Sequence, residues 1–155
     1  MSRRYAPLLL LLAASAACAK KIPGTDIDDT RDNRAIVDVI DAYRKAFEAR
    51  DAAAAMALVS ADYFDDAGTA DASDDLDRAQ LAKVLPETLA RLPAVKLELA
   101  VTRIDVDGDK ASAYLYHDSR YRVATPRGEI PKRDADTSRM TFRRENGYWK
   151  IASGL

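Results

Sequence analysis

The second half of the chain alternates apolar and polar residues with a period of two, and this pattern restricts the possible fold most strongly. Apolar residues recur at alternate positions over 95–101 and again over 111–123. Such alternation predicts antiparallel strands that bury one face and leave the other in water. Asp107-Gly108 and Asn146-Gly147 are dipeptides typical of two-residue turns, so we expect two β-hairpins.

The apolar positions of the first hairpin change parity close to residue 102. Pairing straight through the turn would place Leu97 on the same face as Tyr116, a mismatch of apolar and polar positions. One extra residue at Thr102-Arg103, a β-bulge, brings the apolar positions into line, so we predict a bulge there. The expected cross-strand pairs are Lys96 with Asp118 and Glu98 with Tyr116.

The second hairpin is predicted to join strands 140–145 and 148–152 through Asn146-Gly147. It places Arg144 opposite Trp149 and Phe142 opposite Ile151. Residues 124–135 contain two prolines and a glycine, so we expect a long irregular connection between the two hairpins.

The first half predicts three helices and one short strand. Apolar residues at helical spacing indicate the first helix, with Asp32 or Asn33 as its N-cap, and Asp51 is the expected N-cap of the second. The third helix is expected to begin after Ser73 or Asp74 and to be kinked or split at Pro86. The apolar face of the first helix contains Ile36, Ile40, Tyr43 and Phe47, and the predicted short strand covers Tyr63–Thr69.

The N-terminus has the features of a signal peptide over residues 1–17. Arg3 and Arg4 precede an apolar stretch that ends at Ala19, which is shorter than the roughly 20 residues of a membrane-spanning helix. Ser15-Ala16-Ala17-Cys18 resembles a bacterial lipobox, with serine where leucine is usual, which makes Cys18 the expected lipidation site. The predicted organisation is a lipidated cysteine and flexible tether over 18–33, followed by one domain over 34–155.

The expected location is therefore the bacterial cell envelope, with the lipid in the outer membrane or on the outer face of the cytoplasmic membrane. A simple small-residue cleavage site is the alternative, and it would release a secreted or periplasmic soluble protein.

Composition excludes several classes of function. The net charge is −1 and becomes −3 when the leader with Arg3 and Arg4 is removed, so the chain lacks the basic excess of a nucleic-acid-binding protein. One histidine and one cysteine cannot form a usual zinc site or an internal disulfide. The acidic cluster around Asp71 and Asp74 lacks the glycine and the terminal acid of an EF-hand loop. We expect neither a metal nor a cofactor.

The order of elements resembles that of the nuclear transport factor 2-like (NTF2-like) superfamily, in its SnoaL-like branch. The resemblance covers about residues 35–153 and is carried by Tyr43–Phe47, Asp51, Asp62-Tyr63-Phe64 and Gly147–Ile151. It implies an α+β, cone-shaped, cystatin-like fold, in which three N-terminal helices pack on a curved antiparallel sheet around an apolar pocket. Some members of that superfamily are isomerases, dehydratases or cyclases, whereas many are non-catalytic binding or assembly modules, so the fold alone selects no function.

The predicted inner face of the sheet contains the candidate site residues. His117 is the single histidine and normally titrates near neutral pH, so it is a candidate proton carrier, and Asp65 is a candidate base. The alternatives are a core histidine satisfied by a hydrogen bond and a solvated aspartate. The candidate pocket residues are Tyr43, Tyr63, His117 and Tyr121.

We expect this pocket to bind a small apolar molecule or a partner protein without catalysis. The alternative is an isomerase, dehydratase or hydrolase that transfers protons through His117 or Asp65. A third alternative is an envelope interaction module that uses the outer sheet face, either in a homodimer or with another protein, since tyrosine and arginine are enriched in interfaces. That face contains Tyr114, Tyr116, Arg120, Arg139, Thr141 and Arg143.

Overall fold

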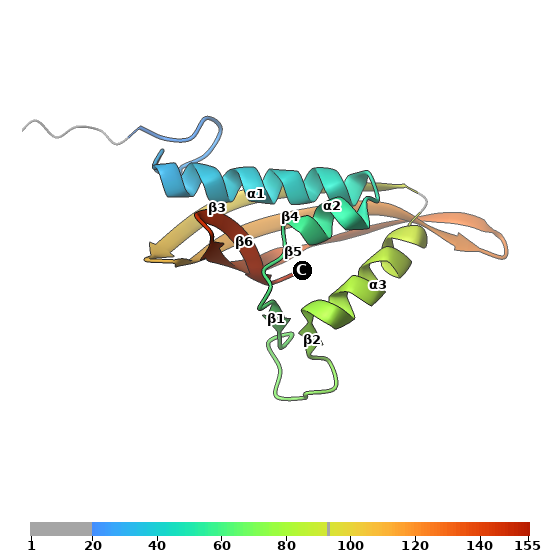
Figure 1. Ribbon diagram of the computed structural model, residues 1–155. Coiled ribbons are helices and arrows are strands. Elements are labelled where there is room, and N and C mark those ends of the chain that lie inside the picture. Colours follow the sequence, from blue (N-terminus) through green and yellow to red (C-terminus); the bar gives the residue numbers. More distant parts are fainter. Residues whose placement is uncertain (1–19, 93) are drawn as a thin grey trace, which may run out of the picture.

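The computed structural model describes residues 20–92 and 94–155 and shows an α+β arrangement (Figure 1). Four strands form an antiparallel sheet in the order β3-β4-β5-β6, and β1 and β2 form a separate short pair. The predicted signal peptide and Cys18 lie outside the described residues. The elements are α1 (Arg31–Glu48), α2 (Ala52–Ala57), β1 (Phe64–Asp65), β2 (Leu76–Asp77), α3 (Arg78–Ala90), β3 (Val95–Asp107), β4 (Lys110–Thr125), β5 (Gly128–Glu145) and β6 (Tyr148–Ser153).

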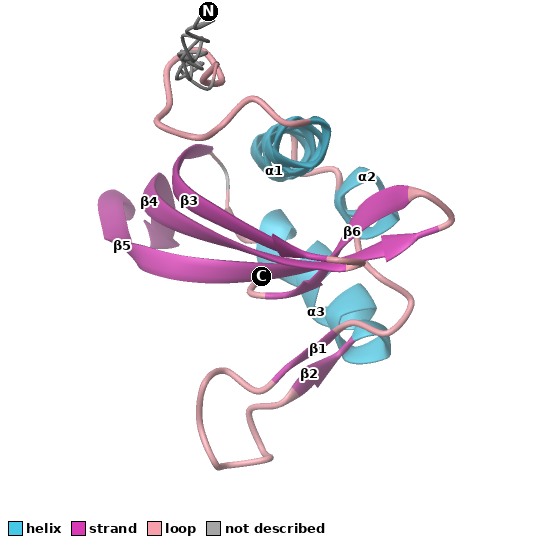
Figure 2. Cartoon of the chain, turned by 90° about the vertical axis from the view of Figure 1, so that its left-hand side faces the viewer, coloured by secondary structure: helices cyan, strands magenta, loops and turns pink. Residues whose placement is uncertain are grey.

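The hydrophobic core lies between the three helices and the inner face of the sheet. Figure 2 shows α1 and α2 side by side, and α3 contacts α2 and lies beside the β1–β2 pair. No helix in the described part of the chain is long and apolar enough to span a bilayer. Core residues include Ile36, Ile40, Ala55, Leu81, Leu89, Leu115, Met140, Phe142, Trp149 and Ile151.

The N-terminus of α1 differs from the prediction. Thr30 is the N-cap, because its backbone is extended and its hydroxyl accepts a hydrogen bond from the Asn33 N–H at 3.1 Å. The expectation of Asp32 or Asn33 as N-cap is therefore wrong. The described part of the predicted tether has a turn just before the helix, where the Ile22 N–H donates to the Ile27 carbonyl at 2.9 Å.

The start of α3 and the length of β1 also differ from the prediction. Asp77 and Gln80 form a reciprocal capping box, so α3 begins at Arg78 instead of after Ser73 or Asp74, and it continues through Pro86 without being split. The predicted strand 63–69 is reduced to the two residues of β1. Its continuation is prevented by Asp65 and Asp66, whose side chains accept hydrogen bonds from the backbone two residues ahead and form a turn.

The bulge in β3 is confirmed between Val101 and Arg103, and the inner and outer faces are as predicted. The predicted cross-strand pairs are wrong, however, because Asp107 pairs with Lys110 and the turn residues are therefore Gly108 and Asp109. Moving a turn by one residue shifts the pairing by two, which preserves the parity of each face. The observed pairs are Lys96 with Arg120 and Glu98 with Asp118.

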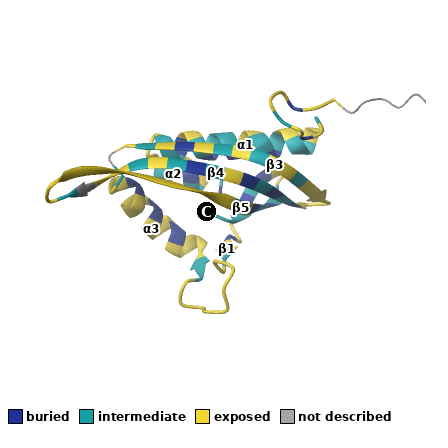
Figure 3. Ribbon diagram, turned by 180° about the vertical axis from the view of Figure 1, so that it is seen from behind, coloured by how far each residue is buried: buried dark blue, intermediate teal, exposed yellow. Residues whose placement is uncertain are grey.

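The second hairpin has the predicted pairs, Arg144 with Trp149 and Phe142 with Ile151. The predicted irregular connection over 124–135 is wrong, since β4 and β5 continue to a turn between Thr125 and Gly128. There Pro131 is tolerated because β5 is an edge strand beyond the residues that pair with β6. Figure 3 shows this hairpin end as mainly exposed, and we call residues 119–133 the hairpin arm.

Candidate functional site

A pocket of about 640 Å³ opens between α1, the inner face of the sheet and the C-terminus. Its walls are mainly apolar, and side chains from α1, β3, β4 and β5 contribute to them. The volume lies within the range typical of sites that enclose one small molecule. The apolar lining residues are Phe47, Leu97, Leu99, Leu115, Met140 and Leu155.

His117, on the inner face of β4, is among the residues that line this pocket. Its position opposite Leu99 on β3 places it among the apolar lining residues. The side chain is 24% exposed, and its Nε2 lies 3.9 Å from a carboxylate oxygen of Asp134. His117 therefore borders the cavity instead of being enclosed in the core, and its ring is accessible to a bound molecule.

Tyr43 supplies a second polar group at the wall of the pocket. Its side chain is buried, and this burial raises the pKa of the phenol to about 12, so the hydroxyl keeps its proton at neutral pH. The described residues give the hydroxyl no hydrogen-bond partner. Tyr43 lines the pocket, so its hydroxyl is a candidate donor to a bound molecule.

Asp65 also lines the pocket, but its carboxylate is engaged within the protein. It accepts hydrogen bonds from the Ala67 N–H at 3.0 Å, the Gly154 N–H at 2.6 Å and the Tyr63 hydroxyl at 3.3 Å. Burial and the adjacent Asp65 charge raise the pKa of Tyr63. These bonds fasten the C-terminal residues against β1, which is a structural role for Asp65.

The predicted pocket residues do not all come together. Tyr43 and His117 line one pocket, whereas Tyr63 is buried behind Asp65 and is not among the lining residues. Tyr121 lies farther along β4, within the hairpin arm, where it lines a separate groove.

Several lining residues were not predicted from the sequence. Asp134 and Ser138 belong to the part of β5 that was predicted to be mostly loop, because no apolar alternation marks it as a strand. Leu155 reaches the pocket because Gly154, at φ +93°, packs against the backbone of Arg139, where a Cβ would clash with the carbonyl oxygen. No periodic pattern marks such a position.

Within residues 20–92 and 94–155 no group of three or more metal-ligand side chains is placed to hold an ion. In the acidic loop between β1 and β2, carboxylates accept hydrogen bonds from other residues of the same loop instead. The Asp71 carboxylate accepts from the Ser73 N–H, and the Asp74 carboxylate accepts from the Thr69 hydroxyl.

The residues predicted for an interface lie on the outer face of the sheet, but one of them, Arg139, is also among the residues that line the pocket. Tyr116 is 42% exposed, the Arg103 guanidinium lies 5.4 Å from the Tyr114 ring centre, and Arg143 pairs with Asp62 at 2.6 Å. A homodimer through this face stays a prediction.

Comparisons with known proteins identify the fold. A family model described as a SnoaL-like domain matches residues 36–154, and a comparison with curated proteins gave no match. A conserved protein from Planctomyces limnophilus has a solved structure with a TM-score of 0.67 and 16% identity, covering 79% of this chain and 92% of that one. These matches confirm the predicted α+β NTF2-like fold.

Two further structures are similar. One, from Streptomyces avermitilis, is provisionally assigned as a dehydratase of the NTF2-like family; its TM-score is 0.63 at 18% identity, covering 79% of this chain and 93% of that one. The other, from Novosphingobium aromaticivorans, is provisionally assigned as a scytalone dehydratase. Its TM-score is 0.63 at 16% identity, and the match covers 79% of this chain and 80% of that one. At such identities the likeness concerns the fold alone.

Proposed function

This chain belongs to the SnoaL-like domain family, and we propose that its pocket binds a small, mainly apolar molecule and catalyses no reaction. The observation that supports this proposal most is the pocket of about 640 Å³, whose surface is more apolar than polar. Its polar lining residues are Tyr43, Asp65, Asp66, His117, Ser119, Asp134, Ser138, Arg139 and Ser153. Apolar walls favour a hydrophobic ligand, because contact with them removes apolar surface of both partners from water.

The polar groups of the pocket restrict the ligand further. The Tyr43 hydroxyl is a donor without a partner among the described residues, and His117 can donate or accept through its ring. A ligand with one or two oxygen atoms on an apolar body would satisfy both groups. A partner protein that inserts one apolar side chain is the other occupant compatible with this lining.

A proton-transfer enzyme is the second candidate, because His117 reaches the same cavity. Three hydrogen bonds occupy the carboxylate of Asp65, which leaves fewer free lone pairs for accepting a substrate proton. The charged group nearest the His117 ring within the described residues is Asp134, at 3.9 Å, which is too far for the hydrogen bond that orients a catalytic base. These contacts support binding over catalysis.

Methyl NMR of the full chain with the apolar fluorophore N-phenylnaphthylamine tests where binding takes place. We expect the methyl signals of Leu99, Leu115 and Met140 to shift on titration, because these side chains line the pocket. The methyl signals of Val106 and Ile130 are internal controls, since both side chains are exposed outside it. Shifts confined to the control residues, or no shifts at all, would exclude the pocket as the binding site.

We also propose that the domain is exported and anchored to the bacterial envelope through Cys18, on the basis of the apolar leader and the lipobox-like sequence. Expressed in a bacterium, the full chain should partition into the detergent phase, and Cys18→Ser should release it or stop its processing. A wild-type protein in the aqueous phase, with an unmodified Ala17 or Lys20 at its N-terminus, would contradict the anchor.

A further inference from the structure

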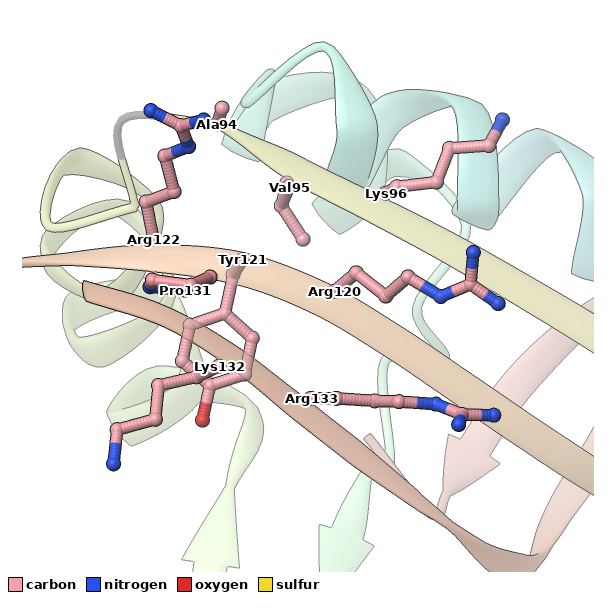
Figure 4. A pocket seen from close by; sticks show the side chains of 9 residues that line it. All are labelled: Ala94, Val95, Lys96, Arg120, Tyr121, Arg122, Pro131, Lys132 and Arg133. Carbon is pink, nitrogen blue, oxygen red and sulfur yellow. The ribbon is translucent and has the colours of Figure 1, made fainter. Parts of the chain in front are cut away.

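Three cations stand directly opposite one another on the outer face of the sheet. Lys96 of β3, Arg120 of β4 and Arg133 of β5 are cross-strand neighbours, and Figure 4 shows their side chains extending in the same direction. Like charges at directly opposed positions of a sheet repel one another. The row is therefore unfavourable unless other groups compensate its charge.

Asp118 supplies part of this compensation. Its carboxylate is nearly buried and accepts a hydrogen bond from Arg120 Nη2 at 3.0 Å and from Arg133 Nε and Nη2 at 3.0 and 2.7 Å. The hydrogen bonds from Arg133 and Arg120 lower the pKa of Asp118 to about 2, so it is ionised at neutral pH. One buried carboxylate thus orients two guanidinium groups and balances the charge of only one.

Lys96 is also only partly compensated. Its ammonium lies 3.4 Å from Glu48 Oε1, but the same carboxylate forms a closer contact with Arg44, at 2.7 Å, and accepts the Leu97 N–H. The charge of Glu48 is therefore shared between two cations. An additional anion beside this row would reduce the remaining repulsion.

The guanidinium groups keep free donors on their exposed side. The side chain of Arg120 is 56% exposed and that of Arg133 is 60% exposed. Each guanidinium carries five N–H groups, of which Arg120 donates one to Asp118 and Arg133 donates two. They border a groove of about 450 Å³, whose floor between the strands includes Ala94 and Pro131 (Figure 4). The site combines oriented donors with an apolar surface.

The surrounding charge favours an anion at this end of the molecule. Residues 119–133 contain five Lys and Arg residues and one Glu, whereas residues 62–77 contain seven Asp residues and no Lys or Arg. The hairpin arm therefore carries an excess of positive charge, which would steer anions toward it.

We propose that this groove is an anion-binding site that recognises a phosphate group. Two planar guanidinium forks held in place by a common carboxylate match the oxygen atoms of a phosphate, and the adjacent ammonium adds a third cation. The apolar floor accommodates the organic part of a phosphate ester. A soluble phosphate ester and a phospholipid headgroup share this chemistry.

The test uses the full chain and two probes. The first is inorganic phosphate, whose binding is monitored through the NMR signals of the arginine Nε–H groups. The second is sedimentation with vesicles of phosphatidylcholine alone or mixed with phosphatidylglycerol. We expect Arg120→Gln with Arg133→Gln to weaken binding at least tenfold. Arg127→Gln, in the exposed turn of the arm and outside the groove, should weaken it less than twofold. Every variant contains the same leader, so its own affinity for vesicles cancels in the comparison.

Arg122→Gln separates a loss of binding from a loss of folding. Arg122 lines the groove but pairs with exposed Glu129, so its replacement leaves the buried Asp118 with both of its partners. We expect it to weaken binding at least threefold, and added salt to weaken it further. A response to phosphate identifies a soluble ligand, and a response to phosphatidylglycerol vesicles alone identifies a membrane headgroup; both support the site. Equal binding by wild type and the groove variants, or an equal loss with Arg127→Gln, would overturn it.

Discussion

Replacing Trp149 by alanine should lower the free energy of unfolding by about 3–5 kcal/mol, a large part of the stability of a domain of this size. Trp149 is 4% exposed on β6, where its ring lies 4.3 Å from the Arg144 guanidinium carbon. Its Nε1 donates to Asp32 at 3.2 Å, which links the sheet to the first turn of α1. The substitution removes a large apolar side chain from the core and separates these two elements. Urea unfolding of the full chain measures the change.

Tyr148→Ala is the matched control, because this adjacent aromatic residue is 73% exposed. We expect it to change stability by no more than about 0.5 kcal/mol. A loss below about 1 kcal/mol for Trp149→Ala would contradict the packing of β6 described above.

The faces of the strands could be predicted from the sequence, whereas the register of the first hairpin could not. The alternation around Leu97 and Leu115 depends only on which side chains must be buried, and a shift of two residues leaves it unchanged. The choice between Asp107-Gly108 and Gly108-Asp109 as the turn depends on local backbone preference. Both dipeptides tolerate the required positive φ, so composition did not decide between them.

The hairpin arm was not predicted because its residues do not follow the buried-strand pattern. Residues 128–137 of β5 are exposed throughout, so no apolar alternation marks them as a strand. Pairing with β4 maintains the strand instead, and Pro131 was interpreted as a loop signal although it lies at an edge. The N-caps at Thr30 and Asp77 were missed for a different reason, because several neighbouring residues in each stretch are suitable caps.

The candidate site was predictable where it depends on strand parity and not where it depends on tertiary contacts. The position of His117 follows from the alternation with Leu115. The contribution of Leu155 and the bonds that occupy Asp65 arise from the way the C-terminus packs on β1, which no local pattern specifies. Tyr63 was assigned to the pocket because the predicted short strand borders the pocket mouth in the family that the chain resembles, yet the side chain is buried in the core.

Leu99→Trp should weaken the binding of N-phenylnaphthylamine at least tenfold, which corresponds to about 1.4 kcal/mol. Leu99 lines the pocket directly opposite His117, so the larger indole would occupy volume that the probe needs. The pocket is open, so the added atoms have free space and should disturb the fold little. Val106→Trp is the control, because Val106 is an exposed residue of the same strand outside the pocket.

Fluorescence titration of the wild-type chain and these two variants with N-phenylnaphthylamine tests the proposed binding function most directly. We predict saturable binding by the wild type and by Val106→Trp with similar affinity, and at least tenfold weaker binding by Leu99→Trp. Equal affinity in all three proteins, or no saturable binding by the wild type, would contradict a ligand-binding pocket between α1 and the sheet.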